Sequence, residues 1–215
     1  MNVIKKLLHA LWQQNFETLS EPNLVWTIYF LAFIVIFLEN GLLPAAFLPG
    51  DSLLVLLGVL VAKGALSFFP ALVLLSFAAG LGSWISYLQG KWLKNNRIID
   101  GWMEHLPLHY HNQAYLMFHR YGLSALLIGR FIAFVRTLLP IIAGLSGLGN
   151  SSFQFFNWTS AFLWVFILVL IGFSLERTSV FQSYEQELML CLILLPLILL
   201  MIGCISSLAI IWRRK

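Results

Sequence analysis

From Phe37 to Ser52 the chain reads FLENGLLPAAFLPGDS, which places two carboxylates, Glu39 and Asp51, around a break at Pro49-Gly50. Apolar residues fill most of this stretch and the runs on both sides of it. A carboxylate at the centre of a membrane-spanning helix costs about 2.5–3.5 kcal/mol, so it is tolerated where it has a partner or lines a wet cavity. The stretch therefore predicts a functional site inside a membrane.

The composition predicts an integral membrane protein made only of helices. Of the 215 residues, 60% are hydrophobic and 10% are charged, and the mean hydropathy is +0.87. This exceeds what a soluble domain needs to fill its core. The net charge is +4, but Lys and Arg stand in short clusters at the edges of apolar segments. Such clusters indicate membrane orientation rather than nucleic-acid binding, and we expect one membrane domain over residues 1–215.

Four stretches are apolar over about the 20 residues that a helix needs to cross a bilayer. They are residues 24–43, 68–90, 153–173 and 188–212. Residues 1–20 alternate apolar and polar positions at helical spacing, which predicts an amphipathic helix lying at the interface. Residues 91–121 form the only long polar stretch and are expected to be an interfacial connection.

Two further apolar blocks, residues 44–64 and 122–149, are broken too often to cross the membrane. The first breaks at Pro49-Gly50, and the second contains Pro140 and several glycines. Arms of about ten residues are too short to span, so each block is predicted to be a re-entrant hairpin. Irregular backbone at membrane depth requires surrounding protein or water, so the hairpin tips are expected to face a cavity.

Basic residues set the expected orientation. With four spans, Lys5, Lys6, the cluster after residue 90 and the terminal basic residues all fall on the cytoplasmic side. Both termini are then cytoplasmic, and the acidic segment near residue 180 faces outward. One alternative stays open: if residues 24–43 form one arm of a larger hairpin, the N-terminal helix moves to the other face.

The two halves of the chain show a sparse internal repeat. The alignment places residues 51–54 on 136–139, Gly64 on Gly149, and residues 67–68 on 152–153. Residues 44–90 and 122–175 would then each be a hairpin followed by a span, with the hairpins entering from opposite sides. Inverted repeats of this kind are typical of secondary transporters, which bind cargo near the membrane midplane.

The charges divide between the halves: Glu39 and Asp51 in one, Arg130 and Arg136 in the other. Left unpaired, four buried charges would cost on the order of 10 kcal/mol, so acid–base pairing is expected. A purely structural interpretation is a permanent set of salt bridges between the hairpins. Each acid also has a structural interpretation of its own. Asp51 can be the N-cap of the helix after Pro49-Gly50, and Glu39 can be an interfacial residue at the end of a span.

A functional interpretation is that protonating one acid releases an arginine. Arginine stays charged and suits bidentate binding of phosphate, so a proton can be exchanged for an anionic head group. Backbone amides after Pro49-Gly50 can assist as anion donors.

Other kinds of site have little support. His105, His109, His111 and His119 lack a compact further ligand, so solvated interfacial histidines or pH sensing explain them better than a metal site. No catalytic triad or phosphate loop is present, so we expect no enzyme, cofactor or metal.

Several motifs together resemble the DedA family of bacterial inner-membrane proteins. They are Glu39, Phe47–Leu54 (FLPGDSLL), Gly129-Arg130-Phe131, Val135-Arg136-Thr137, Pro140 and Ala143-Gly144. The resemblance runs from about residue 24 to the C-terminus, and one departure is Ala133, where many members carry Pro. It assigns the family's acidic pair to Glu39 and Asp51 and its arginine pair to Arg130 and Arg136.

What the resemblance implies is a transporter with two opposed re-entrant hairpins that depends on the proton motive force. The family is linked to envelope integrity, cell division and resistance to cationic peptides, and some members are implicated in returning undecaprenyl phosphate across the membrane. The expected partners are therefore protons and membrane lipids, undecaprenyl phosphate among them. Small residues at every fourth position from Ala78 to Gly90 serve either internal packing or a homo-oligomer.

Three functions remain in competition. The first is proton-coupled movement of a lipid phosphate, held by the arginines. The second is a proton-coupled exporter or antiporter of small cations or drugs, bound by the acids. The third is a scaffold for envelope proteins that transports nothing.

Overall fold

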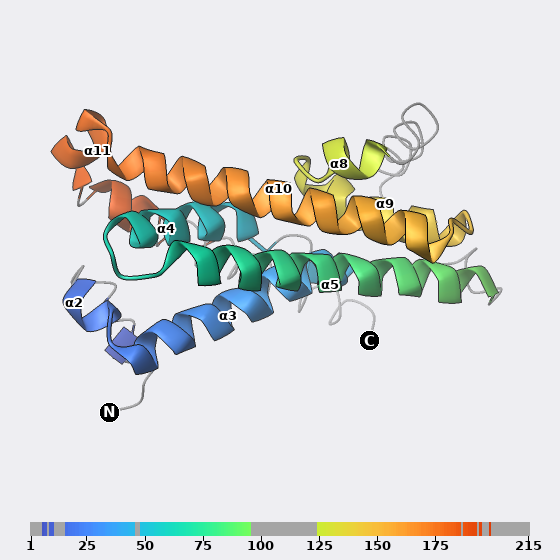
Figure 1. Cartoon of the computed structure of the whole chain (residues 1–215), viewed down its shortest axis with the longest axis horizontal. Coiled ribbons are helices and arrows are strands. Elements are labelled where there is room, and N and C mark those ends of the chain that lie inside the picture. Colours follow the sequence, from blue (N-terminus) through green and yellow to red (C-terminus); the bar gives the residue numbers. More distant parts are fainter. Residues whose placement is uncertain are drawn as a thin grey trace, which may run out of the picture. The chain divides into compact units, whose positions relative to one another are not determined.

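The structure is a computed structural model that describes residues 6–7, 9–10, 16–45, 48–95, 124–185, 187–192, 194 and 198. All regular elements in these residues are helices, which confirms the predicted all-α class (Figure 1). In chain order they are α2 (Phe16–Leu19), α3 (Pro22–Gly41), the 3-10 helix η1 (Leu43–Ala45), α4 (Gly50–Ala62), α5 (Phe68–Asn95), α8 (Ala125–Gly129), α9 (Ala133–Leu145), α10 (Asn150–Glu176) and α11 (Ser179–Ser183).

Three of these helices are long and apolar enough to cross a membrane: Pro22–Gly41, Phe68–Leu93 and Asn150–Glu176. They coincide with three of the four predicted spans. The fourth span, at residues 188–212, lies mostly outside the described residues, as do much of the N-terminal amphipathic helix and almost all of the polar connection at 91–121. The structure thus confirms a multi-pass helical chain with three candidate spans.

The two short apolar helices, α4 and α9, stand where the hairpins were predicted. Each has 13 residues, which at about 1.5 Å per residue gives a length near 20 Å. The hydrocarbon core of a bilayer is about 30 Å thick. Neither helix is therefore long enough to cross it alone.

The chain divides into two compact units. One comprises residues 1–35, 48–75 and 165–215, and the other comprises residues 36–47 and 76–164. The first unit holds α4 and the second holds α9, while α3, α5 and α10 each contribute a portion to both. Each unit is described by itself below.

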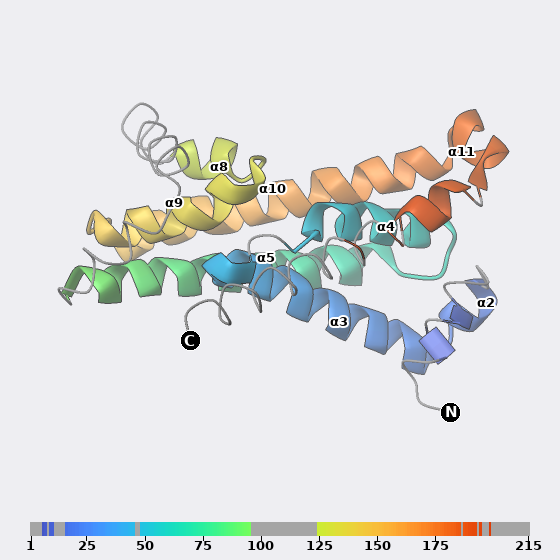
Figure 2. The same cartoon turned by 180° about the vertical axis from the view of Figure 1, so that it is seen from behind.

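In the first unit, α4 packs closely against the last part of α10. A Cβ atom at Gly58 would overlap the Val169 carbonyl oxygen, and one at Gly172 would overlap the Val55 carbonyl oxygen. Figures 1 and 2 both show α4 running alongside α10. Glycine is needed at both contacts because the two backbones touch there.

In the second unit, α9 makes the same contact with α5. A Cβ atom at Gly144 would overlap the Tyr87 carbonyl oxygen, and one at Gly90 would overlap the Ile141 carbonyl oxygen. In both units, the carbonyl that one glycine meets belongs to the residue three positions before the other glycine. The short helix of each half therefore packs on the long helix of the other half in one shared geometry.

The structure also corrects the register of the internal repeat. The two glycines with positive φ are Gly64 (78°) and Gly147 (77°), each just after a short helix. Their turns share a hydrogen-bond pattern: the next residue, Ala65 or Leu148, donates to a carbonyl five residues back. Gly64 therefore corresponds to Gly147, an offset of 83 residues, and the predicted match of Gly64 with Gly149 was wrong. The same offset removes the match between Asp51 and Arg136.

One end of the first unit carries a cluster of charges around Lys63, the residue that follows α4. Its Nζ lies 3.2 Å from Glu176 Oε1 and 2.7 Å from Glu185 Oε1, and 5.5 Å from the centre of the Phe16 ring on α2. Helix α2 and the acidic segment therefore lie at the same end of this unit. The four-span layout places these two segments on opposite sides of the membrane, whereas the alternative in which residues 24–43 form one arm of a larger hairpin accommodates this cluster.

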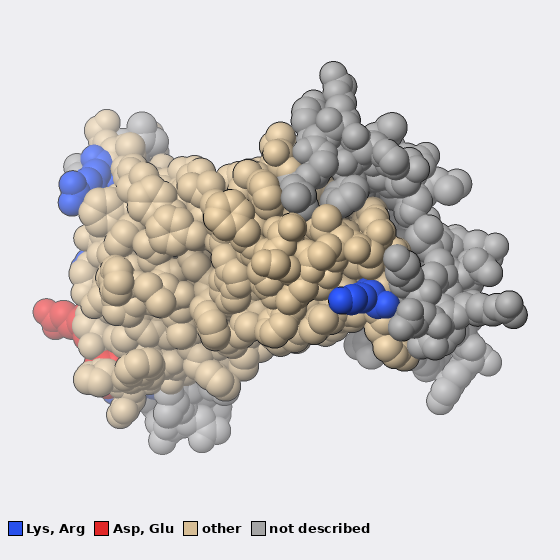
Figure 3. All heavy atoms as spheres, turned by 45° about the vertical axis from the view of Figure 1, so that its right-hand side comes forward, with Lys and Arg blue, Asp and Glu red and all other residues tan. Residues whose placement is uncertain are grey.

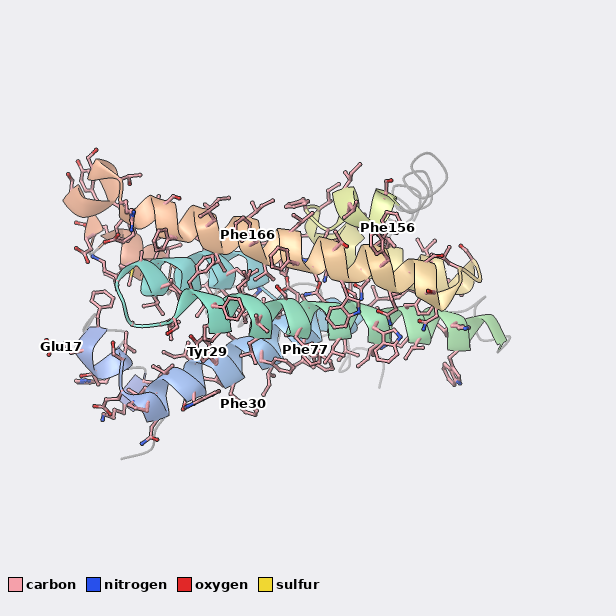
Figure 4. The ribbon with its side chains drawn as sticks, viewed as in Figure 1. Glu17, Tyr29, Phe30, Phe77, Phe156 and Phe166 are labelled. Carbon is pink, nitrogen blue, oxygen red and sulfur yellow. The ribbon has the colours of Figure 1, made fainter. Side chains whose placement is uncertain are left out.

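Helix α3 passes beside the turn between α4 and α5. The Tyr29 hydroxyl donates to the Ser67 carbonyl (3.1 Å) and accepts from the Ser67 amide (3.2 Å). Tyr29 is 5% exposed, whereas the next residue, Phe30, is 63% exposed and points away from the other helices (Figure 4). Large apolar side chains are exposed on α3, α5 and α10 alike, and few charged residues appear on the face shown in Figure 3. Such a surface is typical of helices that face lipid.

The close glycine contacts yield a stability prediction. Gly58→Val and Gly144→Val should each lower the free energy of unfolding by about 1–3 kcal/mol, the usual cost of overpacking. Valine is only a slightly better helix former than glycine, so propensity will not mask the clash. Thermal unfolding in detergent measures the effect. The control is Gly149→Val, where a Cβ meets nothing within 4 Å; equal midpoints in all three variants would contradict the packing.

The Lys63 cluster yields a pH prediction. Burial alone would lower the pKa of the Lys63 amino group, but Glu185 and Glu176 outweigh burial and raise that pKa above the ordinary 10.5. A group whose pKa is raised on folding stabilises the fold in full at any pH below its ordinary pKa. This stabilisation is lost as the pH rises through the raised pKa. Arginine stays charged throughout this range. Melting temperatures of wild type and Lys63→Arg should therefore run in parallel up to about pH 10 and diverge above it, with wild type falling faster; parallel curves up to pH 12 would refute the assignment.

Candidate functional site

The second unit contains a buried ion pair between Glu39 of α3 and Arg136 of α9. Arg136 Nη2 donates to Glu39 Oε1, and the two residues are 4% and 0% exposed. They stand 97 positions apart in the chain. The structure therefore joins one acid and one base from the four predicted charges. Glu39 stands near the end of the candidate span Pro22–Gly41, where the interfacial interpretation placed it, but its side chain is enclosed by protein.

The end of α3 is held in place by α5. The Ser86 hydroxyl donates to the Asn40 carbonyl (2.8 Å), and the Gln89 side-chain amide donates to the Gly41 carbonyl (3.0 Å). These bonds supply partners to carbonyls that the end of a helix leaves unsatisfied. Gly41 itself approaches Gly82 near the middle of α5. The stripe of small residues on α5 thus serves packing within the chain, and it fixes where Glu39 stands.

Arg130 lies at the break between α8 and α9, and its guanidinium contacts both α5 and α10. Nη2 donates to the Ala79 carbonyl (3.0 Å) and to Ser83 Oγ (3.1 Å). Nη1 donates to Ser160 Oγ (2.9 Å), the Asn157 carbonyl (3.2 Å) and Asn157 Oδ1 (3.3 Å). All five acceptors are neutral. No carboxylate among the described residues forms an ion pair with this arginine.

Trp164 of α10 contacts both arginines. Its ring centre lies 4.6 Å from Arg136 Cζ and 5.9 Å from Arg130 Cζ, and the residue is buried. Cations are attracted to the face of an aromatic ring within about 6 Å. Trp164 therefore offsets part of the repulsion between two buried positive charges.

Sequence reasoning did not single out Trp164, Asn157, Ser160 or Ser83. A signal for two of them was present. Asn157 and Ser160 are spaced i, i+3 in a mostly apolar helix, and polar residues at this spacing share one helix face. Polar residues on one face of a spanning helix generally turn toward the protein interior.

Asp51 is assigned to the other compact unit, in the first turn of α4. The N-cap of α4 is Pro49, which makes no side-chain cap bond. The interpretation of Asp51 as N-cap was therefore wrong by two positions. A carboxylate in the first turn still interacts favourably with the helix dipole.

The predicted hairpin breaks have different outcomes. Helix α4 begins at Gly50 directly after Pro49, so this break is confirmed as a helix start. Pro140, in contrast, lies inside α9, and the prediction of a break there was wrong. Proline removes one helical hydrogen bond and usually bends a helix. Membrane helices tolerate proline because neighbouring groups can bond to the backbone carbonyl that it leaves free. The chain instead breaks at residues 130–132, and α9 begins at Ala133.

No group of three His, Cys, Asp or Glu side chains that could hold a metal ion occurs among the described residues. His105, His109, His111 and His119 lie outside them.

The helices and the buried charges define the class: a multi-pass all-α membrane protein whose second unit encloses a Glu–Arg pair beside another arginine. Residues 48–174 match the family model described as the VTT domain. The chain therefore belongs to the VTT-domain family, the DedA family, as its motifs indicated. The VTT region covers α4, α5 and α8 to α10 but begins after Glu39.

Named relatives support this assignment. The chain is 59% identical to "Inner membrane protein YqjA" of Escherichia coli K12 over 215 residues, which is 100% of this chain and 98% of the relative. It is 49% identical to "Inner membrane protein YghB" of the same strain over the same shares. "Protein DedA" of that strain is 26% identical over 176 residues, or 81% of this chain and 80% of the relative. The motifs also indicated the YqjA and YghB branch, and these identities confirm it together with an inner-membrane location. No solved structure matches the chain.

The ion pair yields a prediction for stability. Glu39→Gln or Arg136→Gln alone should cost roughly 3–5 kcal/mol of unfolding free energy, because each leaves a buried charge without its partner. The double variant should cost less than the sum of the two. Unfolding in mixed detergent micelles measures all three. Glu21→Gln, which breaks the exposed Lys6–Glu21 pair, serves as control and should cost less than about 1 kcal/mol; strict additivity of the two site variants would contradict the pairing.

Proposed function

We propose that this protein is a proton-motive-force-dependent transporter of the DedA type that moves a lipid phosphate across the inner membrane. The lipid is undecaprenyl phosphate or a phospholipid. The observation that carries the proposal is the buried Glu39–Arg136 pair beside a second arginine, Arg130, whose acceptors are all neutral. Two closely placed guanidinium groups suit a phosphate better than a cation.

The coupling step is a proton exchange at Glu39. While Glu39 is ionised it holds Arg136. A proton arriving on Glu39 removes the negative charge, and Arg136 keeps its positive charge because arginine does not deprotonate in proteins. The released guanidinium then needs an anion, and a phosphate group accepts two parallel hydrogen bonds from it. Loss of the proton reforms the ion pair and expels the lipid head group.

The proposed transporter contains two re-entrant hairpins, each with one of the short helices. We propose that α3 and α4 form a hairpin that enters the membrane and returns to the same face, and that α8 and α9 form a second, opposed hairpin. The contacts of α3 with Ser67 and of Phe16 with Lys63 support the first hairpin, because they bring both of its ends together. Asp51, at the start of α4, is proposed as a second proton carrier.

At the level of the cell, the proposal places the protein in recycling of envelope lipids. Support for envelope integrity, cell division and resistance to cationic peptides would follow from a steady supply of lipid carriers. The protein catalyses no bond breakage in this scheme, so it needs no cofactor.

Reconstituted liposomes test the proposal. Wild type should translocate undecaprenyl phosphate faster with a pH gradient than without one. Arg136→Ala should slow translocation about tenfold or more, since a hydrogen bond to a charged group is worth about 1.5–3 kcal/mol. Glu39→Gln should abolish the response to the gradient.

The matched control is Arg177→Ala, which removes an arginine stacked on Phe173 outside the site and should leave the rate unchanged. Translocation that is insensitive to Arg136→Ala would refute lipid-phosphate transport. Proton flux driven by small cations and lost in Glu39→Gln would instead indicate the exporter. Wild-type liposomes inactive in both assays would favour the scaffold.

A further inference from the structure

Asn157 of α10 occupies a position that links Arg130 to α5. Its Oδ1 accepts from Arg130 Nη1 at 3.3 Å, and its Nδ2 donates to the Gly80 carbonyl at 2.9 Å. The side chain is 1% exposed. One end of the amide must accept and the other must donate, so the orientation of the group is determined by its partners.

The chemistry of this position matters because of the charge beside it. A carboxylate here would pair with Arg130, as carboxylates generally do with buried arginines. The amide satisfies the same guanidinium hydrogen bond without a negative charge. The other acceptors, two hydroxyls and two backbone carbonyls, are neutral as well.

Arg130 also retains a spare donor. Its Nε is buried and has no hydrogen-bond partner in the part of the chain that the structure describes. A buried donor without a partner costs free energy, and an anionic group that binds at the arginine would remove this cost. The surroundings of Arg130 thus hold the side chain in place while leaving both charge and a donor for a ligand.

We infer that Asn157 determines specificity in the proposed site: as a neutral amide against Arg130, it leaves the arginine's charge to attract an anionic phosphate head group. This inference rests on the proposed function and goes beyond it, because it assigns the preference for anions to a residue outside the Glu39–Arg136 pair.

Two lysolipids that share one acyl chain test the inference on the purified full-length protein in a nonionic detergent. Lysophosphatidic acid carries an anionic phosphate monoester, and lysophosphatidylcholine carries a zwitterionic head group. Titration calorimetry gives the dissociation constant for each. The readout is the ratio of the two dissociation constants, because a general folding defect weakens the binding of both lipids alike.

Asn157→Asp adds a carboxylate beside Arg130 and loses the donor to Gly80. Asn157→Ser loses that same donor but adds no charge, so it is the matched control. Ser83→Asp brings a carboxylate to Arg130 from α5 and does not disturb the Gly80 bond. We expect both Asp variants to weaken binding of lysophosphatidic acid about tenfold or more relative to lysophosphatidylcholine, and Asn157→Ser to keep most of the wild-type ratio.

Two results would overturn the inference about Asn157. One is a wild-type ratio in both Asp variants, and the other is an equal loss of the ratio in Asn157→Ser and Asn157→Asp, which would make the residue merely structural. A wild-type protein without preference for lysophosphatidic acid would instead refute the proposed binding of lipid phosphate itself.

Discussion

The Glu39–Arg136 pair is the interaction on which the second unit depends. A buried ion pair contributes little net stability, but removing one partner leaves a charge in a medium of low dielectric constant. The C-terminal end of α3 and the first turn of α9 must therefore stay together as long as both groups are charged. Helix α5 holds both of them: its Ser86 and Gln89 bind the end of α3, and its backbone contacts Gly144 of α9. The glycine contacts and the ion pair thus require the same arrangement of helices.

Arg130 and Arg136 lie close together but are stabilised differently. Arg136 has a carboxylate that can gain or lose a proton, whereas the bonds to Arg130 come from groups that do not titrate near neutral pH. The described acceptors of Arg130 are thus neutral, whereas the described partner of Arg136 is a carboxylate. In the transport cycle that we propose, Arg130 is the constant binding group and Arg136 is the group that is released, although the two arginines looked equivalent in the sequence.

Hydropathy and length predicted three spans and the positions of both short helices, because these features depend on composition over many residues. Features that depend on single contacts were harder to predict. Pro140 resembled a break, yet it lies inside α9. The repeat was misaligned because sparse identities do not reveal which glycine adopts positive φ. The pairing of Glu39 with a base was expected from the cost of a charge in a membrane. Asn157 and Trp164 were missed because burying a neutral polar or aromatic residue costs less than burying a charge, so the signal from Asn157 and Ser160 was weaker.

The repeated glycine contact has an evolutionary consequence. At Gly58 with Gly172, and again at Gly90 with Gly144, the backbones touch so closely that a side chain at either position displaces the other helix. Substitution at one position cannot be accommodated by its partner, which is already the smallest residue. The packing of both halves is thereby closed to gradual change. Paired substitutions at two touching glycines cannot compensate for each other, so a change in this packing requires a whole helix to move.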